Sequence, residues 1–430
     1  MRVGLISLKS GDGCVPMGLV YIGTYLKKHG VDVEIIDSNY CDPLQVVLSG
    51  KFDLLGISAM TVHYGRAVRL ATQIKSRTKI PIIIGGVHIS TLPVSMHESF
   101  DTAIIGEGEQ VFLHMAKYGI TKGIVPGVPI ENLDDLPQPD WDLVDPRYFT
   151  YGPDSTFGEF GISGNVLTSR GCPYRCRFCS TTKFWDKLRF HSAEYVKDMV
   201  DNLVNNYNAN LIQIWDDLFT INLPRLKKLK LNKKAKFNCQ PRPNLVTDEL
   251  CLLLKDLNVT TGIFGFESGC DKILGYLKRD TVTVEQNKKA IQLFKKHKIG
   301  IQGSVVFGSP GETIEDMHAT LDFIDYCYSQ GVERLWAFVL TPFPGTELWQ
   351  DRFSNWDRLA LQDDNNPLLL DNTVDIKEFH KVFRMAQDKI KKFRYRKVGM
   401  FVKNSPWDSF KYACQAPLKT MDLLTRRLDV

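Results

Sequence analysis

Three cysteines lie close together in one short segment, at the spacing Cys172-x-x-x-Cys176-x-x-Cys179. Three thiolates on one segment can hold an iron–sulfur cluster while one iron is left without a protein ligand. An open coordination position on a metal is where a substrate or cofactor binds and reacts. The spacing therefore predicts a catalytic metal cluster with these three cysteines as its ligands.

Structural roles explain the three cysteines less well. A zinc site would need a fourth ligand, and the nearest candidates, Cys239 and His191, fit no usual zinc pattern. We expect no disulfide framework, because the apolar stretch at the N-terminus is too short for a signal peptide. Other cysteines, such as Cys251 and Cys327, have the neighbours typical of small core residues.

The bulk composition is that of an ordinary globular protein. A chain of 430 residues has room for two or three domains, and 43% hydrophobic with 24% charged residues is typical of soluble proteins. A net charge of +5 is too small to indicate nucleic-acid binding. No apolar run approaches the roughly 20 residues that span a bilayer. We therefore expect a protein of the reducing cytoplasm.

Residues 1–120 alternate short apolar strands with amphipathic helices, such as Met17–His29, which is the pattern of a parallel α/β sheet. Small or polar residues follow the strands, and doubly wound sheets bind ligands at the carboxyl ends of their strands. The pattern predicts a Rossmann-like doubly wound sheet with a ligand site at that edge. The expected strands are Val3–Ser7, Val31–Asp37, Asp53–Ser58, Ile80–Ile84 and Thr102–Ile105.

The rest of the chain divides into three further parts. Residues 121–165 are rich in proline, glycine and aspartate and are predicted to be a linker. Residues 166–348 resume the strand–helix alternation, which suits a partial (βα) TIM-type barrel, and residues 349–430 are predicted to form a helical tail. The expected barrel strands are Val166–Ser169, Leu211–Trp215, Lys236–Asn238, Thr261–Phe266, Gly300–Phe307 and Arg334–Leu340.

The cysteine motif, with Phe178 directly before its third cysteine, resembles the signature of the radical S-adenosylmethionine (SAM) superfamily. The six strand–helix units that follow resemble the partial barrel of the same family. The resemblance implies a [4Fe-4S] cluster whose open iron binds SAM and cleaves it to a 5′-deoxyadenosyl radical. It also implies an external reductant such as flavodoxin or ferredoxin.

Residues at the carboxyl ends of the expected barrel strands supply the chemistry that SAM needs. The guanidinium of Arg242 suits the SAM carboxylate, and Glu267 can accept hydrogen bonds from the ribose or the amine. By the same resemblance, Asp216 or Asp217 would contact the methionyl end of SAM; alternatively, the two aspartates only cap a helix. Phe178, together with the backbone near Val306 and Leu340, would enclose adenine. The predicted SAM-binding residues are Phe178, Asp216, Asp217, Gln240, Arg242, Glu267, Val306 and Leu340.

The glycine-containing loops of residues 1–115 resemble the cobalamin-binding domain found ahead of many radical SAM cores. The loop Ser10–Gly18, however, lacks the histidine that many such domains use as a cobalt ligand. The domain would bind cobalamin without that ligand, or would keep only the fold. His88 is a possible substitute ligand, although a histidine in such a loop more often shapes the backbone. The predicted cobalamin-binding residues are Ser58, Gly85, Gly86, Val87, His88, Gly106 and Glu107.

These features predict a radical SAM methyltransferase that uses cobalamin and methylates an unactivated carbon or phosphorus. One alternative is a cobalamin-free radical SAM enzyme that catalyses cyclisation, rearrangement or C–C bond formation. A methylthiotransferase would need three more cluster cysteines near the N-terminus, where only Cys14 and Cys41 occur. A non-catalytic iron–sulfur redox protein would need no SAM pocket.

The sequence leaves the substrate open among small molecules, lipids and peptides. The basic segment Lys389–Lys397 contains aromatic residues and could contact an anionic headgroup at a membrane surface. A solvated helix face is the simpler explanation for these charges.

Overall fold

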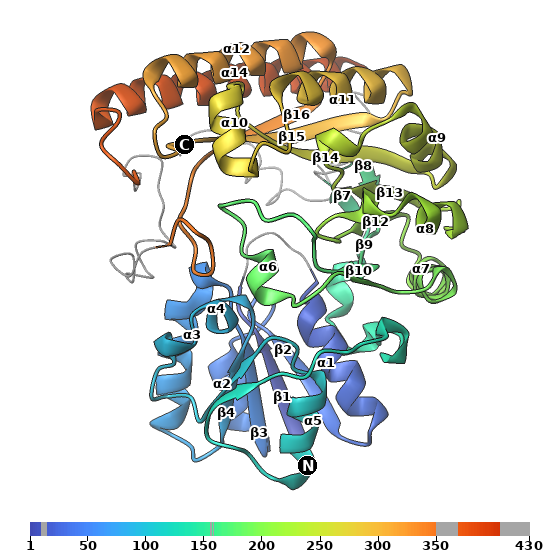
Figure 1. Ribbon diagram of the computed structural model, residues 1–430. Coiled ribbons are helices and arrows are strands. Elements are labelled where there is room, and N and C mark those ends of the chain that lie inside the picture. The colour runs from blue at the N-terminus through green and yellow to red at the C-terminus, as the bar shows by residue number, and fades with distance from the viewer. Residues whose placement is uncertain (10–14, 155–156, 158, 350–368, 405–430) are drawn as a thin grey trace.

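The computed structural model describes residues 1–9, 15–154, 157, 159–349 and 369–404, and contains two parallel sheets, one above the other in Figure 1. Each sheet carries its own helices. A third segment, drawn in green, lies between the two sheets and includes the three cysteines. The predicted fold class, a Rossmann-like sheet followed by a partial barrel and a helical C-terminal region, is confirmed.

The N-terminal sheet has six parallel strands in the order β2-β1-β3-β4-β5-β6. Successive side chains of a strand point to opposite faces, so Leu5 enters one apolar core and Ile6 enters the other. The sheet is therefore buried on both faces, as its apolar strands require. The strands are β1 Arg2–Ser7, β2 Asp32–Asp37, β3 Leu54–Ser58, β4 Ile82–Gly85, β5 Thr102–Ile105 and β6 Gly123–Pro126; the helices are α1 Met17–Lys28, α2 Pro43–Ser49, α3 Thr61–Lys75, α4 Val87–Thr91 and α5 Glu109–Tyr118.

The second sheet also has six parallel strands, in the order β16-β15-β14-β13-β12-β9. Helices cover its outer face, and the last helix packs against α12 and β16. The strands are β9 Ser163–Val166, β12 Leu211–Ile214, β13 Lys236–Cys239, β14 Val259–Glu267, β15 Gly300–Phe307 and β16 Arg334–Val339; the helices are α7 Ala193–Asn206, α8 Leu223–Lys228, α9 Asp248–Asp256, α10 Asp271–Lys278, α11 Val284–Lys296, α12 Ile314–Gln330 and α14 Ile376–Asn404.

The segment between the sheets is more structured than a linker. Its strand β6 adds a sixth strand to the N-terminal sheet, beyond the expected end at residue 120. The side chain of Trp141 is buried in the large core that also contains the barrel residues. The short elements are β7 Gly152–Asp154, β8 Glu159–Gly161, β10 Ser169–Arg170, β11 Arg189–Phe190, α6 Thr181–Phe184 and the 3-10 turns Pro93–Ser95, Leu133–Asp135, Trp141–Leu143, Pro146–Phe149, Phe219–Ile221 and Pro243–Leu245.

The first barrel strand was predicted at Val166–Ser169, but β9 begins and ends three residues earlier. The side chains of Thr168 and Ser169 both donate hydrogen bonds to the carboxylate of Asp216. Because these polar side chains turn toward Asp216, the parallel ladder ends at Val166. Ser169 then begins β10, which pairs with β11 as a short antiparallel hairpin around the cysteine segment.

The carboxyl ends of the two sheets face each other. Thr91, in the helix after β4, lies so close to the loop after β16 that a Cβ added at Gly345 would be 2.7 Å from its methyl group. Glu107, in the loop after β5, forms an ion pair with Arg170, which follows β9. Ligand sites at both edges therefore open toward one shared junction.

Replacing Gly303 with alanine tests the packing of the second sheet. A Cβ at this position would lie 2.5 Å from the Phe266 ring and 2.9 Å from the carbonyl oxygen of Phe264. We expect Gly303→Ala to lower the free energy of unfolding by about 1–3 kcal/mol in urea denaturation of the apoprotein. Gly18 has open space around it, so Gly18→Ala is the matched control and should not destabilise the fold. Equal losses in both variants would contradict this packing.

Candidate functional site

The three cysteines occupy an irregular loop, the cysteine loop (residues 171–180), between β10 and α6. All three side chains are partly exposed and none forms a disulfide. The pKa of Cys172 is raised to about 11, mainly by burial; Asp217 and the nearby thiols of Cys179 and Cys176 contribute to this rise, and a hydrogen bond from the backbone of Tyr174 opposes it. Because a cluster binds thiolates, loading this loop with iron must release these protons.

The donor set fits a cluster with three protein ligands. Within the residues that the structure describes, no three histidine, cysteine or carboxylate side chains lie close enough together to bind a single metal ion. In a [4Fe-4S] cluster each cysteine binds a different iron, so its thiols are spaced more widely. Cys239 is buried within β13, and the ring of His191 stacks on Tyr195 and is hydrogen bonded to Asp134. Neither residue is placed as a fourth ligand.

Asp216 and Asp217 hold the cysteine loop in place. Both oxygens of Asp216 accept hydrogen bonds, from the backbone and hydroxyl of Thr168 and from the hydroxyl of Ser169, each at 2.6 Å. Asp217 accepts bonds from the backbone of Gly171 and the hydroxyl of Thr181, each at 3.2 Å, and so joins the two ends of the loop. The predicted contact between Asp216 and SAM would have to displace one of its existing bonds.

Sequence reasoning missed the partners that Asp216 uses. Burial raises the pKa of this fully enclosed carboxyl, and the buried guanidinium of Arg225 opposes that shift. Arg225 also donates a hydrogen bond of 2.7 Å to the carbonyl of Thr168. Thr168 lies 48 positions before Asp216 and 57 positions before Arg225, so no local pattern could have indicated its contacts with them.

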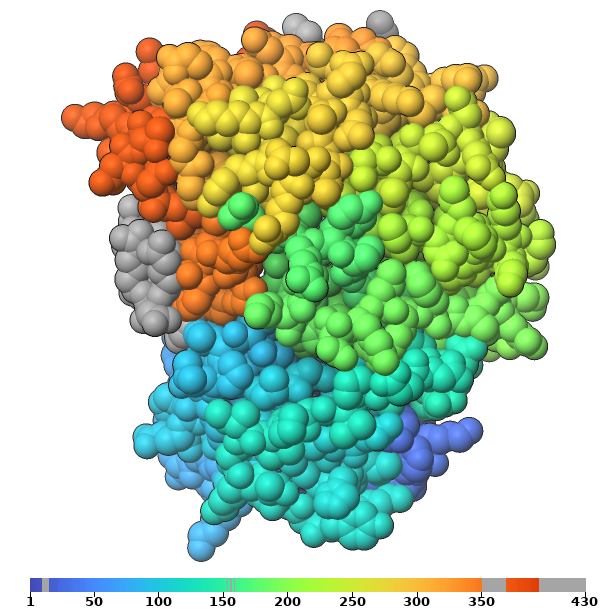
Figure 2. Space-filling model, viewed as in Figure 1, coloured from blue at the N-terminus to red at the C-terminus, as the bar shows by residue number. Residues whose placement is uncertain are grey.

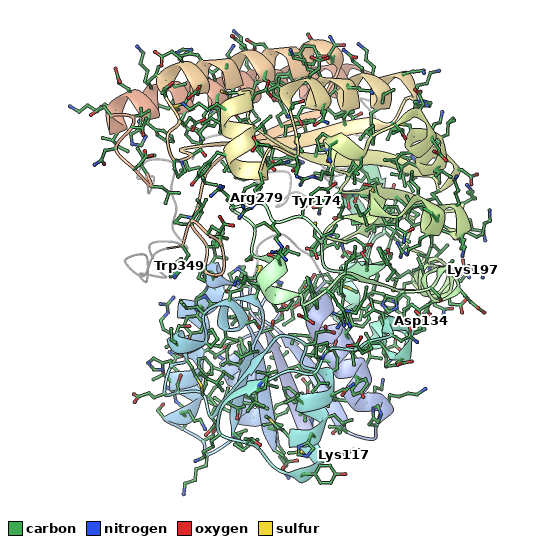
Figure 3. The ribbon with its side chains drawn as sticks, in the orientation of Figure 1. Lys117, Asp134, Tyr174, Lys197, Arg279 and Trp349 are labelled. Atoms are coloured by element: carbon green, nitrogen blue, oxygen red, sulfur yellow. The ribbon has the colours of Figure 1, made fainter. Side chains whose placement is uncertain are left out.

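Arg242, which was predicted to bind the SAM carboxylate, lies beside a cysteine of the loop. One of its nitrogens donates to the sulfur of Cys176 at 3.3 Å, and another donates to Thr281 at 2.6 Å. Its guanidinium stacks over the ring of Tyr174 at 3.8 Å; Figure 3 labels Tyr174 and Arg279 near the centre of the molecule. Arg279 donates to the carbonyl of Arg175 and so links α10 to the same loop. The loop is therefore held from two sides, by Arg242 at Cys176 and by Arg279 at Arg175.

Glu267 ends β14 in an unusual backbone conformation. Its φ of 63° lies in the left-handed region, and the pairing of β14 with β15 shifts register between Gly265 and Glu267. Its carboxylate pairs with the buried Lys278 at 3.2 Å and lies over Gly265, where a Cβ would come within 2.2 Å of Oε1. Strained residues at strand ends are typical of functional sites.

The three residues predicted to enclose adenine lie in one apolar cluster. Phe178 from the cysteine loop, Val306 from β15 and Leu340 after β16 pack together with Leu277. An apolar surface of this kind suits the face of a purine ring. Gln240, in contrast, is exposed just after β13.

The facing edge of the N-terminal sheet offers open space at its glycines. A Cβ added at Gly85 or Gly106 would meet no atom within 4 Å. Gly86 has a φ of 97°, and a Cβ added there would lie 2.8 Å from the carbonyl oxygen of Ala59. Ser58 and Val87 flank these positions and are partly exposed. A bare backbone edge of this kind fits the close approach of a flat macrocycle.

Two of the predicted cobalamin-binding side chains are occupied by protein contacts. His88 is fully buried, its two ring nitrogens lie 3.1 Å from the hydroxyls of Thr61 and Ser95, and its ring stacks on Tyr64. Burial lowers the pKa of His88 to about 4, so the ring is neutral and packs as a core residue. Glu107 is buried among arginines. His88 as found is therefore no cobalt ligand; most of the loop after β1 lies outside the described residues.

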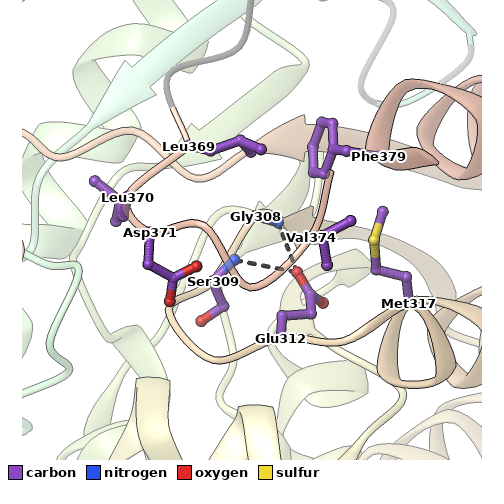
Figure 4. A pocket seen from close by; sticks show the side chains of 9 residues that line it. All are labelled: Gly308, Ser309, Glu312, Met317, Leu369, Leu370, Asp371, Val374 and Phe379. Atoms are coloured by element: carbon purple, nitrogen blue, oxygen red, sulfur yellow. Dashed lines mark hydrogen bonds between the residues drawn. The ribbon is translucent and has the colours of Figure 1, made fainter. Parts of the chain in front are cut away.

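A small cavity of about 10 Å³ lies between the loop after β15 and the segment that leads into α14 (Figure 4). Glu312 accepts backbone hydrogen bonds from Gly308 at 2.6 Å and from Ser309 at 3.1 Å. Burial raises the pKa of Glu312 to about 7. Its second oxygen and the Ser309 hydroxyl have no partner among the described residues, and the cavity has room for about one water.

Comparison with known proteins decides the family. Residues 166–324 match the family model of the Radical SAM superfamily, and residues 4–116 match that of the B12 binding domain. The chain is a radical SAM enzyme with an N-terminal B12-binding domain. The radical SAM domain implies a [4Fe-4S] cluster and SAM, and the B12-binding domain implies cobalamin. Radical SAM enzymes generally need an external reductant such as flavodoxin.

Several proteins resemble this radical SAM enzyme over most of their length. An uncharacterized methyltransferase of Pyrococcus horikoshii is 29% identical over 377 residues, which is 79% of each chain. An anaerobic magnesium-protoporphyrin IX monomethyl ester cyclase of Rubrivivax gelatinosus is 27% identical over 378 residues, covering 78% of this chain and 66% of the relative. The radical SAM methyltransferase TsrM of Kitasatospora setae, solved with cobalamin and a [4Fe-4S] cluster, has a TM-score of 0.67 at 16% identity and covers 91% and 88% of the two chains.

The basic segment that was predicted as a possible membrane contact lies within α14. No helix in the described part of the chain is both long and apolar enough to cross a bilayer. Lys389 forms an ion pair with Asp325 of α12, and Phe393 stacks on Tyr328 at 3.8 Å. The beginning of the basic segment therefore packs against the barrel. Its side chains after Phe393 lie outside the described residues.

Replacing Gly265 with alanine tests the placement of Glu267. The new Cβ would push the carboxylate out of its position over Gly265. If Glu267 binds SAM, the loss of one charged hydrogen bond weakens binding about tenfold. Equilibrium dialysis of SAM with the cluster-loaded enzyme measures this change. In a Glu267→Ala background the same substitution should add almost nothing. A full further loss in that background would show that Gly265 acts independently of Glu267.

The buried Glu312 predicts a pH dependence of stability. Its pKa is raised from 4.5 to about 7, so its neutral form is favoured in the folded state. The stability that it contributes is present below about pH 4.5 and is lost as the pH rises through about 7, by up to about 3 kcal/mol. Glu312→Gln should therefore flatten the dependence of the unfolding free energy on pH between 5 and 8. The exposed Glu315→Gln is the control. An unchanged pH dependence in Glu312→Gln would contradict the assignment.

Proposed function

We propose that this radical SAM enzyme is a cobalamin-dependent methyltransferase that methylates an unactivated carbon or phosphorus atom of its substrate. The observation that carries the proposal is the junction where the carboxyl ends of both sheets face each other. The open glycine edge of the B12-binding domain and the cysteine loop both border this junction. Two cofactors bound there could act on one substrate between them.

The similar proteins support this choice. The relative in Pyrococcus horikoshii is named a methyltransferase, and the TsrM structure contains both cobalamin and a [4Fe-4S] cluster. Each covers more than three quarters of this chain. A relative that covers both domains supports the use of both domains in one reaction.

Different residues of this chain would hold different groups of the cofactors. When bound, SAM at the open iron supplies a 5′-deoxyadenosyl radical and cobalamin supplies a methyl group. Arg242 would hold the SAM carboxylate and Glu267 its amine or ribose. The apolar cluster around Phe178 would exclude water from the adenine and the cluster. Asp217 would keep both ends of the cysteine loop fixed while the cluster changes charge.

A second candidate is a radical cyclisation, rearrangement or C–C bond-forming reaction that uses no methyl transfer. Similarity to the cyclase of Rubrivivax gelatinosus favours it, since that relative matches 78% of this chain. The binding of cobalamin does not distinguish the two candidates, whereas the formation of a methylated product does.

Anaerobic loading with iron, sulfide and hydroxocobalamin tests the proposed cofactor sites. The wild-type protein should bind about one cobalamin and one cluster and should cleave SAM to 5′-deoxyadenosine. Cys176→Ala should lose the cluster and the cleavage but keep cobalamin, because the glycine edge belongs to the other sheet. Cys270→Ala is the matched control, since this nearby cysteine lies outside the loop and bonds to Asp316. Retained cleavage in Cys176→Ala, or no cobalamin in the wild type, would overturn the proposal.

A further inference from the structure

We propose that Arg170, Arg189, Glu107 and Glu109 form a positioning clamp that sets the placement of the cysteine loop relative to the cobalamin site. The inference rests on the proposed use of both cofactors in one reaction. None of the four residues would touch the reacting atoms. They would act by fixing the two parts of the protein that do.

The clamp consists of three ion pairs with short contacts. Arg170 donates to Glu107 at 2.6 Å through one terminal nitrogen and to Glu109 at 2.6 Å through the other. Arg189 pairs with the second oxygen of Glu107 and donates to the carbonyl of Ile130. The backbone N–H of Ile130 in turn donates to Glu107 at 3.3 Å. Glu107 is therefore held from three sides.

The two arginines bracket the cysteine loop. They are directly paired across the β10–β11 hairpin, and the chain between them contains all three cysteines. Cys172 is only two residues from Arg170. A shift or rotation of the loop as a unit would have to carry both guanidinium groups away from their carboxylates.

The two glutamates belong to the B12-binding domain. They follow β5, and Glu109 is the first residue of α5. Gly106, whose open side faces the proposed cobalamin site, is the neighbour of Glu107. In Figure 2 the green atoms of the cysteine segment lie directly against the cyan and teal atoms of the N-terminal part. The clamp thus joins the loop that would carry one cofactor to the loop that would border the other.

Because the four side chains are buried, the ion pairs between them require a specific geometry. The side chains of all four residues are 4–6% exposed, and two positive charges face two negative charges. A buried charge without its partner is strongly disfavoured, because neither water nor a counter-ion replaces the lost contact. Buried ion pairs contribute less to net stability than apolar packing would, so orientation is the better explanation for them here.

Aromatic rings hold the Arg170 guanidinium from both domains. Tyr21 of α1 and Trp185, just after α6, each lie 5.3 Å from it. Burial lowers the pKa of Arg170, but Glu109 and Glu107 outweigh that effect and raise it overall. The group therefore keeps its charge, and cation–π contacts fix its plane.

Electron paramagnetic resonance of the reduced holoenzyme tests the clamp. Low-spin cobalt(II) in cobalamin and a reduced [4Fe-4S] cluster are both paramagnetic, so a fixed separation gives a defined dipolar coupling. We expect one well-defined coupling in the wild type. Glu109→Gln, which keeps the shape but removes one charge, should broaden or abolish it while both cofactors remain bound. Arg170→Met combined with Glu109→Gln should recover unfolding free energy relative to Arg170→Met alone, without restoring the coupling.

The control and the outcomes separate this inference from the proposed function. Glu131→Gln removes an exposed ion pair with Lys187, next to the same two segments, and should leave the coupling unchanged. Loss of unfolding free energy with an unchanged coupling in Glu109→Gln would overturn the clamp and leave a purely structural role. A wild type that binds both cofactors but shows no coupling would instead contradict their proposed use in one reaction.

Discussion

The buried ion pairs between Arg170, Arg189, Glu107 and Glu109 are the interaction on which the arrangement of this protein most depends. Each sheet has its own apolar strands and helices, and Val20 and Tyr21 of α1 also pack in the core of the second sheet. The sites at the two carboxyl edges gain a common function only if the edges are held face to face. An arginine that uses both terminal nitrogens, as Arg170 does, specifies the orientation of its partners. Apolar packing specifies orientation less strictly.

Polar contacts also explain why the first barrel strand does not lie where the apolar pattern of the sequence predicted it. The strand positions followed from apolar runs, and Thr102–Ile105 and Gly300–Phe307 were predicted with the bounds that β5 and β15 have. The first barrel strand was misplaced by three residues because Thr168 and Ser169 bond to Asp216, which lies 47 or 48 positions later. Strand β6 was missed because its Gly123 and Pro126 are typical of a linker, although the edge of a sheet tolerates both residues.

The site could be predicted wherever its chemistry is local in sequence. The spacing of the cysteines identified the loop, whereas Phe178, Val306 and Leu340, which lie in one cluster, are far apart in sequence and were predicted from the loop and the strand ends to which they belong. Glu107 was expected at the cobalamin edge through its loop, but its side chain faces Arg170, 63 positions away. The sequence shows which loop a polar residue belongs to, because strand ends can be predicted. The ion-pair partner of that residue depends on how the two domains dock, which no local pattern shows.

The fate of the SAM methyl group tests the central claim most directly. In the proposed arrangement SAM lies in the barrel and cobalamin lies at the opposite sheet edge, across one junction. With [methyl-²H₃]SAM, excess reductant and both cofactors loaded, mass spectrometry of the extracted cobalamin should find the deuterated methyl group bound to it. Cleavage of SAM to 5′-deoxyadenosine and methionine, with cobalamin present but unlabelled, would contradict the claim that the two edges work together in methyl transfer.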